Sequence, residues 1–399
     1  MTHPSSFSVV RMRPNKSPQR VRFGYPWIYA DELVLDRRTR KLAPGSIVEL
    51  QANDGERLGI CAFNAESKIT CRMLDRDPEA VIDLNWFKIR LQRAFDMRAR
   101  LYDTPNYRLI HAEADGLPGV IIDRFGDVAA VQPNAAWADV RMSEITQALQ
   151  EVTGVSTVIK NGMGRARVLE GLPEEAAVLT GEISAPVAVE MNGATYFADL
   201  LQGQKTGLFF DQRDNQAFAA RLAKGGNVLD VFSHVGGFAL AALAAGAGSA
   251  DAVDGSEAAL DLAARGAEAS GFAGRFATIR GDAFEVMTGL AAEGRQFDLV
   301  VCDPPAFAPN KNALEAGLRA YERVARLGAL LVKPGGYLCV CSCSHAADLA
   351  KFRTASIRGI GRAGRAGPLI HTGGAGPDHP LHPYLAESGY LKSLFFRLD

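Results

Sequence analysis

Residues 228–238 read Val228-Leu229-Asp230-Val231-Phe232-Ser233-His234-Val235-Gly236-Gly237-Phe238. The first half is a short apolar run of the kind found in a buried strand, and the paired glycines indicate a turn into a following helix. Glycine lets the backbone approach a ligand closely at a helix N-terminus. The stretch therefore predicts the first strand and the ligand-binding turn of an open α/β sheet.

Further strands and Ala-rich helices are expected to alternate after this turn. The expected strands are Asn227–Phe232, Ala250–Asp254, Ala277–Arg280, Phe297–Cys302 and Gly336–Cys341. Short, fully apolar strands separated by helices are typical of a doubly wound parallel sheet. The longest run of small apolar residues is too short to span a bilayer. We therefore expect an α/β domain and no membrane partner.

Acidic residues recur where these strands end. Asp254 ends the second strand, and Asp282 and Asp303 follow the third and fourth. Open α/β sheets bind their ligands at this edge, and an acid after the second strand can bind ribose hydroxyls. A NAD-binding Rossmann domain would share this arrangement. However, the run Asp303-Pro304-Pro305-Ala306-Phe307 has no role in hydride transfer.

These residues resemble the class I methyltransferases, which use S-adenosylmethionine as cofactor. In that family the first loop binds the methionine part, the Asp254 position the ribose, and the Asp282-Ala283 position the adenine. The Asp-Pro-Pro-aromatic position faces the methyl acceptor. The resemblance implies as cofactor-binding residues Asp230, Phe232, Ser233, Gly236, Gly237, Asp254, Gly255, Ser256, Asp282, Ala283 and Asp303.

Three cysteines alternate along the fifth expected strand, in Leu338-Cys339-Val340-Cys341-Ser342-Cys343-Ser344. Cys339 and Cys341 are expected to fill the core, and no metal site is expected. Cys343 lies at the carboxyl end, where a thiolate can add to C6 of cytosine and make C5 nucleophilic. We expect Cys343 and Asp303 to be catalytic, with Asp303 bonded to the ring N3. A free thiol, with a pKa of ~8.5, needs local activation for this role.

A polar run with an apolar centre precedes the first strand: Gly203-Gln204-Lys205-Thr206-Gly207-Leu208-Phe209-Phe210-Asp211-Gln212-Arg213. It can be an ordinary strand and turn with ion pairs, or a wall of the cofactor or base pocket. On the second interpretation, the substrate-binding residues of the sheet domain are Lys205, Asp211, Arg213, Pro304, Pro305 and Phe307.

Two smaller domains are expected before the sheet. Residues 1–76 contain short alternating apolar runs between turn residues, which predicts a small β-rich domain. Residues 77–185 predict a linking helix and an α+β domain with a hairpin at Gly126-Asp127. Residues 186–399 are expected to form the catalytic domain, beginning with a hairpin at Asn192-Gly193.

The charges are unevenly distributed, although the net charge is only −1. Residues 1–76 carry 13 Lys/Arg against 8 Asp/Glu, a balance of +5, and residues 1–30 hold five basic residues and no acidic one. Such a patch fits contact with phosphate, and a solvated basic surface is the alternative. Six cysteines without a disulfide-like spacing, and no signal peptide, predict a reducing, cytoplasmic compartment.

Taken whole, the chain resembles the RlmI-type family of bacterial 23S rRNA cytosine-C5 methyltransferases. The motifs that carry the resemblance are Gly24-Tyr25-Pro26-Trp27-Ile28-Tyr29, Gln204-Lys205-Thr206-Gly207, Asp303-Pro304-Pro305-Ala306-Phe307, Ser342-Cys343-Ser344, Asp378-His379-Pro380 and Gly389-Tyr390-Leu391-Lys392. The first is similar to the PUA domain, a small RNA-binding β-barrel, and implies that Trp27 contacts the substrate. The resemblance implies a 23S rRNA partner and 5-methylcytosine formed through a cysteine–C6 adduct. It leaves the oligomeric state open, a homodimer included.

Two other functions stay open on the sequence. An RNA guanine N-methyltransferase can use the same Asp-Pro-Pro-aromatic motif but needs no thiol, so Cys343 discriminates between the two chemistries. The third is a non-catalytic RNA-binding assembly factor with a decayed methyltransferase fold. The intact acids after the strands argue against it.

Overall fold

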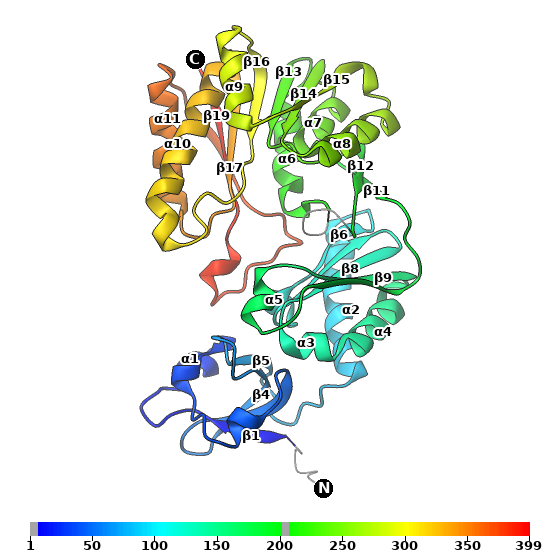
Figure 1. Cartoon of the computed structure of the whole chain (residues 1–399), viewed down its shortest axis with the longest axis vertical. Helices are drawn as coiled ribbons and strands as arrows, with labels where there is room; N and C mark the ends of the chain where they lie inside the picture. Colours follow the sequence, from blue (N-terminus) through cyan, green and yellow to red (C-terminus); the bar gives the residue numbers. More distant parts are fainter. Residues whose placement is uncertain (1–6, 202–206) are drawn as a thin grey trace. The chain divides into compact units, whose positions relative to one another are not determined.

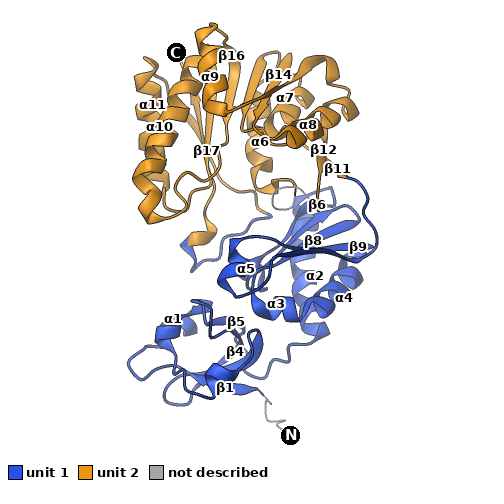
Figure 2. Ribbon diagram, viewed as in Figure 1, with its two compact units in different colours: residues 1–185, 378–386 blue, residues 186–377, 387–399 orange. Residues whose placement is uncertain are grey.

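Figure 1 shows the computed structural model of the chain, which describes residues 7–201 and 207–399. The chain divides into two compact units, residues 1–185 with 378–386 and residues 186–377 with 387–399 (Figure 2). Residues 378–386, which the sequence predicts to lie in the catalytic domain, pack with the first unit. The remaining boundaries of the three expected domains stay predictions.

The first sheet of the first unit is built by the N-terminal region. Its strands follow the order β1-β3-β4-β5-β2, with β1 parallel to β3 and the other pairs antiparallel. A core of Val10, Ile28, Leu50 and Phe63 is buried between them. The expected β-rich domain is thereby confirmed. The bounds are β1 Ser8–Arg11, α1 Gln19–Arg22, β2 Trp27–Ile28, β3 Ser46–Gln51, β4 Arg57–Phe63 and β5 Cys71–Asp75.

A second sheet in this unit has the order β10-β9-β8-β7-β6 and carries four helices. The sequence predicts the linking helix and the hairpin but neither β6 nor β10. The strand β6 mixes polar with apolar residues, and β10 exposes most of its side chains. The bounds are α2 Leu84–Leu101, β6 Asn106–His111, β7 Val120–Phe125, β8 Val128–Pro133, α3 Ala136–Val140, α4 Met142–Thr153, β9 Thr157–Gly162, α5 Arg165–Leu169 and β10 Glu175–Thr180.

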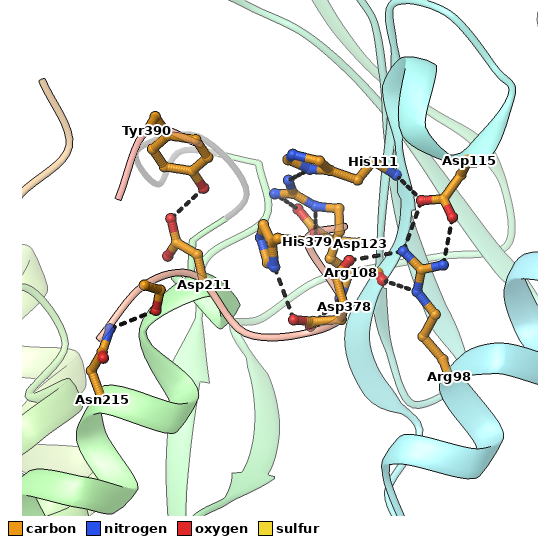
Figure 3. A network of polar contacts seen from close by, with 11 residues as sticks. Arg98, Arg108, His111, Asp115, Asp123, Asp211, Asn215, Asp378, His379 and Tyr390 are labelled. Carbon is orange, nitrogen blue, oxygen red and sulfur yellow. Dashed lines mark hydrogen bonds and ion pairs between the residues drawn. The ribbon is translucent and has the colours of Figure 1, made fainter. Parts of the chain in front are cut away.

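Buried charges explain why residues 378–386 pack with the first unit (Figure 3). The fully buried Arg98 donates to both carboxylate oxygens of Asp115, at 2.6 and 2.7 Å, and to the Asp378 carbonyl at 2.8 Å. The Asp378 carboxylate accepts from the Arg108 amide at 3.0 Å. A buried charge is expensive unless it is paired, so these contacts hold the segment in place.

The second unit contains a hairpin, β11 with β12, and a sheet that in the described chain has seven strands in the order β15-β14-β13-β16-β17-β19-β18. The first five strands are parallel, but β19 runs antiparallel to both β17 and β18. The five strands predicted from the sequence are therefore parallel as expected, and the antiparallel β19 was not predicted. The strand bounds are β11 Val187–Met191, β12 Ala194–Ala198, β13 Asn227–Val231, β14 Ser249–Asp254, β15 Phe276–Arg280, β16 Phe297–Cys302, β17 Val332–Ser342, β18 Leu369–Gly373 and β19 Lys392–Arg397.

Helices cover both faces of this sheet, as a doubly wound fold requires (Figure 1). One group packs α6 against α7 and α7 against α8, and the other packs α10 against α9 and α11. No helix within residues 7–201 and 207–399 combines the length and apolarity needed to cross a membrane. The helix bounds are α6 Arg213–Leu222, α7 Gly237–Ala244, α8 Glu257–Ala269, α9 Ala283–Ala292, α10 Leu314–Leu331 and α11 Leu349–Arg362.

Candidate active site

The turn after β13 has a strained backbone. Phe232 and His234 have left-handed φ angles of 63° and 51°, and Gly236 between this turn and α7 has 77°. Left-handed backbone is uncommon outside glycine and is concentrated at functional sites. A Cβ at Gly237 would lie 2.5 Å from the Gln216 side-chain nitrogen, so that side chain would have to move to make room for it. The strained backbone therefore marks this turn as a candidate functional site.

Asp230 lies beneath this turn and is fully buried. Its Oδ2 accepts from the amides of Phe238 and Ala239, at 3.2 and 2.9 Å, in the first turn of α7. Burial raises the pKa of Asp230 to about 7. Its Oδ1 and the buried Ser233 hydroxyl have no hydrogen-bond partner within the described residues. Such orphaned buried oxygens fit a site that a polar ligand completes.

Asp254 ties the turn to the second strand. One carboxylate oxygen accepts from the His234 amide and the other from the Ser256 amide, both at 2.8 Å. Each carboxylate oxygen has a second lone pair, so ribose hydroxyls can still be accepted. The ribose contact predicted from the sequence stays a prediction. The sequence analysis did not predict that Asp254 also binds the amide of the turn. Gly255 is exposed beside it.

Asp282 caps α9 after the third strand. Its Oδ1 accepts from the amides of Phe284 and Glu285, at 2.9 and 3.1 Å, while Ala283 is buried at the start of the helix. Both amides bind the same carboxylate oxygen. Asp282 is exposed to solvent at the N-terminus of this helix. This placement is compatible with the predicted adenine contact.

Three partly buried aromatic rings cluster beside these acids. Phe232 lies 6.3 Å from Phe284 and 6.5 Å from Phe307, measured between ring centroids, and Phe284 lies 6.1 Å from Phe307. Phe307 also packs against Tyr321 at 5.0 Å. Phe307, predicted to bind substrate, therefore packs with cofactor-side rings. Pro304 of the same loop is buried, whereas Pro305 is exposed.

Asp303 is oriented by a buried chain of amides. Its Oδ2 accepts from the Gln212 side chain at 2.9 Å, and Gln212 accepts from Asn215 at 2.7 Å. Asn215 also donates to the Gly374 carbonyl at 2.9 Å. Gln212 and Asn215 are almost fully buried. Sequence reasoning gave neither residue a role, although Gln212 stands in the polar run that it singled out.

Asp211 directly precedes Gln212 and is bonded by two distant residues (Figure 3). The Tyr390 hydroxyl donates to its Oδ2 at 2.6 Å, and the Gly376 amide donates to its carbonyl at 3.2 Å. Its Oδ1 is buried and has no hydrogen-bond partner among the described residues. Arg213 is buried with its guanidinium over the Phe210 ring. The predicted Lys205 lies outside the described residues.

Cys343 directly follows β17 and differs from the other cysteines. It is partly exposed, whereas the remaining five are buried. Cys339 and Cys341 lie in the core as their alternation predicts, with their sulfurs 3.7 Å apart. Burial raises the pKa of the Cys339 thiol. Cys343 is thus the cysteine best placed to react.

The loop after Cys343 is pinned from two directions. The Ser344 hydroxyl accepts from the Ala308 amide at 2.9 Å and lies 2.7 Å from the Tyr321 hydroxyl. From β19, the Lys392 ammonium donates to the carbonyls of Ser344 and Ala347 at 2.6 and 2.8 Å. Lys392 had no predicted role, because only the pairing of β17 with β19 brings it here.

Trp27, also predicted to bind substrate, lies in the first unit. Its indole N–H donates to Glu113 at 2.8 Å, and Arg72 joins Glu113 and Glu170 with distances of 3.1 and 3.0 Å. These contacts fasten the N-terminal sheet to the second sheet of the same unit. The structure thus shows a packing role for the indole nitrogen, and substrate contact stays a prediction.

The sheet order, the strained turn and the acids at the strand ends define a methyltransferase that uses S-adenosylmethionine. A family model described as S-adenosylmethionine-dependent methyltransferase matches residues 124–397, and a PUA-like domain model matches residues 10–76. The chain belongs to the S-adenosylmethionine-dependent methyltransferase family.

Relatives of similar length carry a more specific name. Proteins called ribosomal RNA large subunit methyltransferase I are 34% identical to this chain in both Aeromonas salmonicida and Shewanella amazonensis. The matches cover 94% of the chain and 95% of the first relative, and 98% and 99% for the second. The family resemblance seen in the sequence is thereby confirmed.

Solved structures support the fold. A Streptococcus mutans protein described as a SAM-dependent methyltransferase matches with a TM-score of 0.80 and 19% identity, over 98% of this chain and 100% of the other. Another chain described as a methyltransferase, solved with SAH, matches with a TM-score of 0.81 and 20% identity over 98% and 99%. At this identity the likeness shows the fold, and the predicted class I architecture is confirmed.

The residues of the second unit fit this cofactor. Asp254 offers a carboxylate for ribose hydroxyls, and the adenine contact predicted for Asp282 and Ala283 stays a prediction. Asp230 and Ser233 hold orphaned buried oxygens in and beneath the turn after β13, and their contact with the methionine part stays a prediction. When bound, S-adenosylmethionine supplies an electrophilic methyl group on sulfur.

Proposed function

We propose that this chain methylates C5 of a cytosine in 23S rRNA, with Cys343 as the nucleophile. The observation that carries the proposal is the placement of Cys343, the partly exposed cysteine at the carboxyl edge of the sheet. Asp303 follows the adjacent strand, since β16 pairs with β17 in parallel register. The names of the relatives support an RNA of the large ribosomal subunit as the substrate.

The proposed chemistry uses two side chains of the chain. The Cys343 thiolate adds to C6 of the ring, and the electron pair of the C5–C6 double bond moves toward C5 and the ring. Asp303, oriented by Gln212, acts in its protonated form and donates its carboxyl proton to N3 as negative charge builds there. After C5 gains its methyl group, a water molecule takes the C5 proton, and the electron pair of that C–H bond restores the double bond and expels the thiolate.

RNA capture is proposed for the first unit. Among its N-terminal cations, Arg20 is exposed and lies over the Tyr25 ring, 3.9 Å from the centroid. Lys16 and Arg22 are instead paired with Asp31 and Glu56. Cations next to an aromatic ring suit phosphates and unstacked bases, so RNA binding should weaken with added salt. A cytoplasmic location and a homodimer stay predictions.

The decisive experiment replaces Cys343. Cys343→Ala should abolish methyl transfer to rRNA while the cofactor and the RNA still bind, because cytosine then has no covalent route to a nucleophilic C5. Cys341→Ala, two residues earlier in the core, is the matched control and should cost only stability, about 1 kcal/mol. Product nucleosides are identified by mass spectrometry.

A trapping experiment provides a second measure. RNA containing 5-fluorocytosine should form a covalent complex with the wild type, since fluorine cannot leave as a proton does, and none with Cys343→Ala. Near-full activity of folded Cys343→Ala would overturn the covalent mechanism. A methylated guanine nitrogen as the product would make the guanine N-methyltransferase the better description. A folded chain that binds no cofactor would favour the assembly factor.

A further inference from the structure

The two groups of helices that cover the sheet of the second unit differ in charge. Helices α9, α10 and α11 carry seven Lys/Arg and three Asp/Glu, a balance of +4, and all seven cations lie on α10 and α11. Helices α6, α7 and α8 carry three Lys/Arg and four Asp/Glu, a balance of −1. The net charge of the whole chain is also −1, so the positive charge is concentrated on one side of this unit.

The arginines of α10 form one exposed row. Arg319, Arg323 and Arg326 follow the spacing i, i+4, i+7, which places them on the same face of a helix. All three are exposed, and together they cover about 10 Å of the helix axis. Tyr321 and Val324, which lie on the other side of the helix, are buried in the core. The three guanidinium groups therefore project into solvent, away from the sheet.

An ion pair joins this row to α11. Glu322, three and four residues from the outer two arginines of the row, is paired with Arg362. Arg358 lies one turn before Arg362 on the same flank of α11 and is exposed. The helix backbones approach closely here, since a Cβ at Gly359 would collide with the Glu322 carbonyl oxygen. The two helices thus share one basic stripe, which consists of Arg319, Arg323, Arg326, Arg358 and Arg362.

Three members of the basic stripe have no acidic partner. Arg319, Arg326 and Arg358 form neither an ion pair nor a side-chain hydrogen bond within residues 7–201 and 207–399. In contrast, Lys351 at the start of α11 is paired with Asp348. An arginine without a carboxylate partner keeps all five of its N–H donors for another molecule. The stripe is therefore available to a negatively charged ligand.

The basic stripe begins at the carboxyl edge of the sheet. The chain enters α10 after the loop that follows Asp303, and it enters α11 after the loop that follows Cys343. Arg323 lies over the ring of Phe284, 4.4 Å from its centroid, and Phe284 belongs to the aromatic cluster at this edge. Figure 1 shows α10 and α11 side by side. A ligand held at the edge can therefore continue along the two helices.

The chemistry of the basic stripe suits the backbone of a nucleic acid. Each of its cations is an arginine, whose planar fork binds phosphate oxygens in pairs and is preferred for phosphate recognition. Cations clustered along a helix are also the usual electrostatic signature of a nucleic-acid surface. A row of charges matches a linear polyanion, which carries its phosphates at regular intervals.

We propose that the basic stripe is a second RNA-binding surface, which holds backbone phosphates of the rRNA next to the target nucleotide. The inference rests on the proposed function, because it takes an RNA as the substrate. It gives the catalytic unit its own share of the RNA affinity, separate from capture by the first unit. Phosphate contacts position an RNA but carry no sequence information, so the stripe contributes affinity and leaves the choice of nucleotide to the active site.

The test removes the three arginines that have no partner in the described chain. A full-length variant combines Arg319→Gln, Arg326→Gln and Arg358→Gln, and Arg323 is kept because it touches the aromatic cluster. The probe is an unmodified 23S rRNA transcript, and its affinity is measured by filter binding at several salt concentrations. Binding at low salt should weaken at least about tenfold, and the slope of log affinity against log salt should fall by about two to three.

A matched control removes the same charge from the other group of helices. It combines Arg221→Gln, Lys224→Gln and Arg265→Gln, three exposed cations on α6, in the loop after it and on α8. This variant should bind the transcript within about twofold of the wild type. Calorimetry should show unchanged affinity for S-adenosylmethionine in both triple variants, which confirms that they fold. Each single substitution in the stripe should lower the salt slope by a little less than one.

Each result decides the proposal. Wild-type affinity and salt slope in the folded stripe variant overturn it, and so does an equal loss in the control, which would assign the effect to net charge. Unchanged RNA affinity, together with stripe-dependent binding to vesicles that contain phosphatidylserine, would identify a membrane surface instead. The binding assay involves no methyl transfer. Stripe-dependent RNA binding with a methylated guanine as the product would therefore retain this inference and reject the cytosine chemistry.

Discussion

The predicted cofactor half and the predicted acceptor half of the sheet's carboxyl edge are held together over different ranges of sequence. In the cofactor half, the carboxylates of Asp230 and Asp254 bind amides at most 20 residues away. In the acceptor half, Tyr390 reaches Asp211 across 179 residues, and Lys392 reaches the Ser344 carbonyl across 48. Contacts between residues close in sequence hold the cofactor half together, whereas the acceptor half depends on contacts with residues near the end of the chain.

Because of this difference, substitutions in the two halves should affect different properties of the protein. Local contacts around the turn after β13 form as soon as β13, β14 and α7 pack, so changes there should act on cofactor binding and stability. Contacts of the acceptor half depend on β19 returning antiparallel to β17. Changes there should act on turnover while the cofactor still binds. The following predictions test this separation in order of decreasing effect.

Asp230→Asn should produce the largest change, in the pH dependence of unfolding without cofactor. The folded pKa of Asp230 is raised to about 7 from 3.8, so the folded state keeps its proton longer than the unfolded chain. Its contribution to stability is complete below about pH 4 and is lost as the pH rises through 7. Three pKa units correspond to at most about 4 kcal/mol. The variant should lose this slope in urea titrations, and Asp251→Asn on the next strand should keep it.

Asp254→Ala should weaken S-adenosylmethionine binding by ~1–3 kcal/mol through lost charge-assisted hydrogen bonds. Calorimetry on the folded variant measures it. Asp251→Ala, three residues earlier in β14 and paired with Arg295 at the surface, is the matched control and should bind normally. If Asp254→Ala binds S-adenosylmethionine with unchanged affinity, Asp254 does not contact the cofactor. The difference between the two halves would then lose part of its support.

Tyr390→Phe should have the smallest effect. It tests the acceptor half, as the two preceding variants test the cofactor half. It removes one hydroxyl bond and leaves the buried Asp211 carboxylate less satisfied, at a cost of about 1 kcal/mol in stability. Turnover should fall several-fold with cofactor affinity unchanged. Tyr337→Phe, in β17, is the control. A loss of cofactor affinity in Tyr390→Phe would show that the halves are not separable.

Much of the cofactor half could be predicted from sequence because its signals are local. An apolar strand, a glycine turn and an acid after the next strand lie within a few tens of residues, and their meaning follows from the strand period and from sheet geometry. The same reasoning predicts that Cys339 and Cys341 are core residues. It could not predict that the Asp254 carboxylate braces the turn, since that depends on the left-handed backbone at His234.

By itself the sequence determined the α/β class, the family and the position of Cys343 at the end of a strand. The tertiary structure decided the antiparallel β19, the amide chain from Asn215 to Asp303, and the bond from the Lys392 ammonium to the Ser344 carbonyl. The physical reason is the range of the forces involved. Hydrophobic periodicity is written into neighbouring residues, whereas the partner of a buried polar group is chosen by whichever distant segment packs against it and satisfies it.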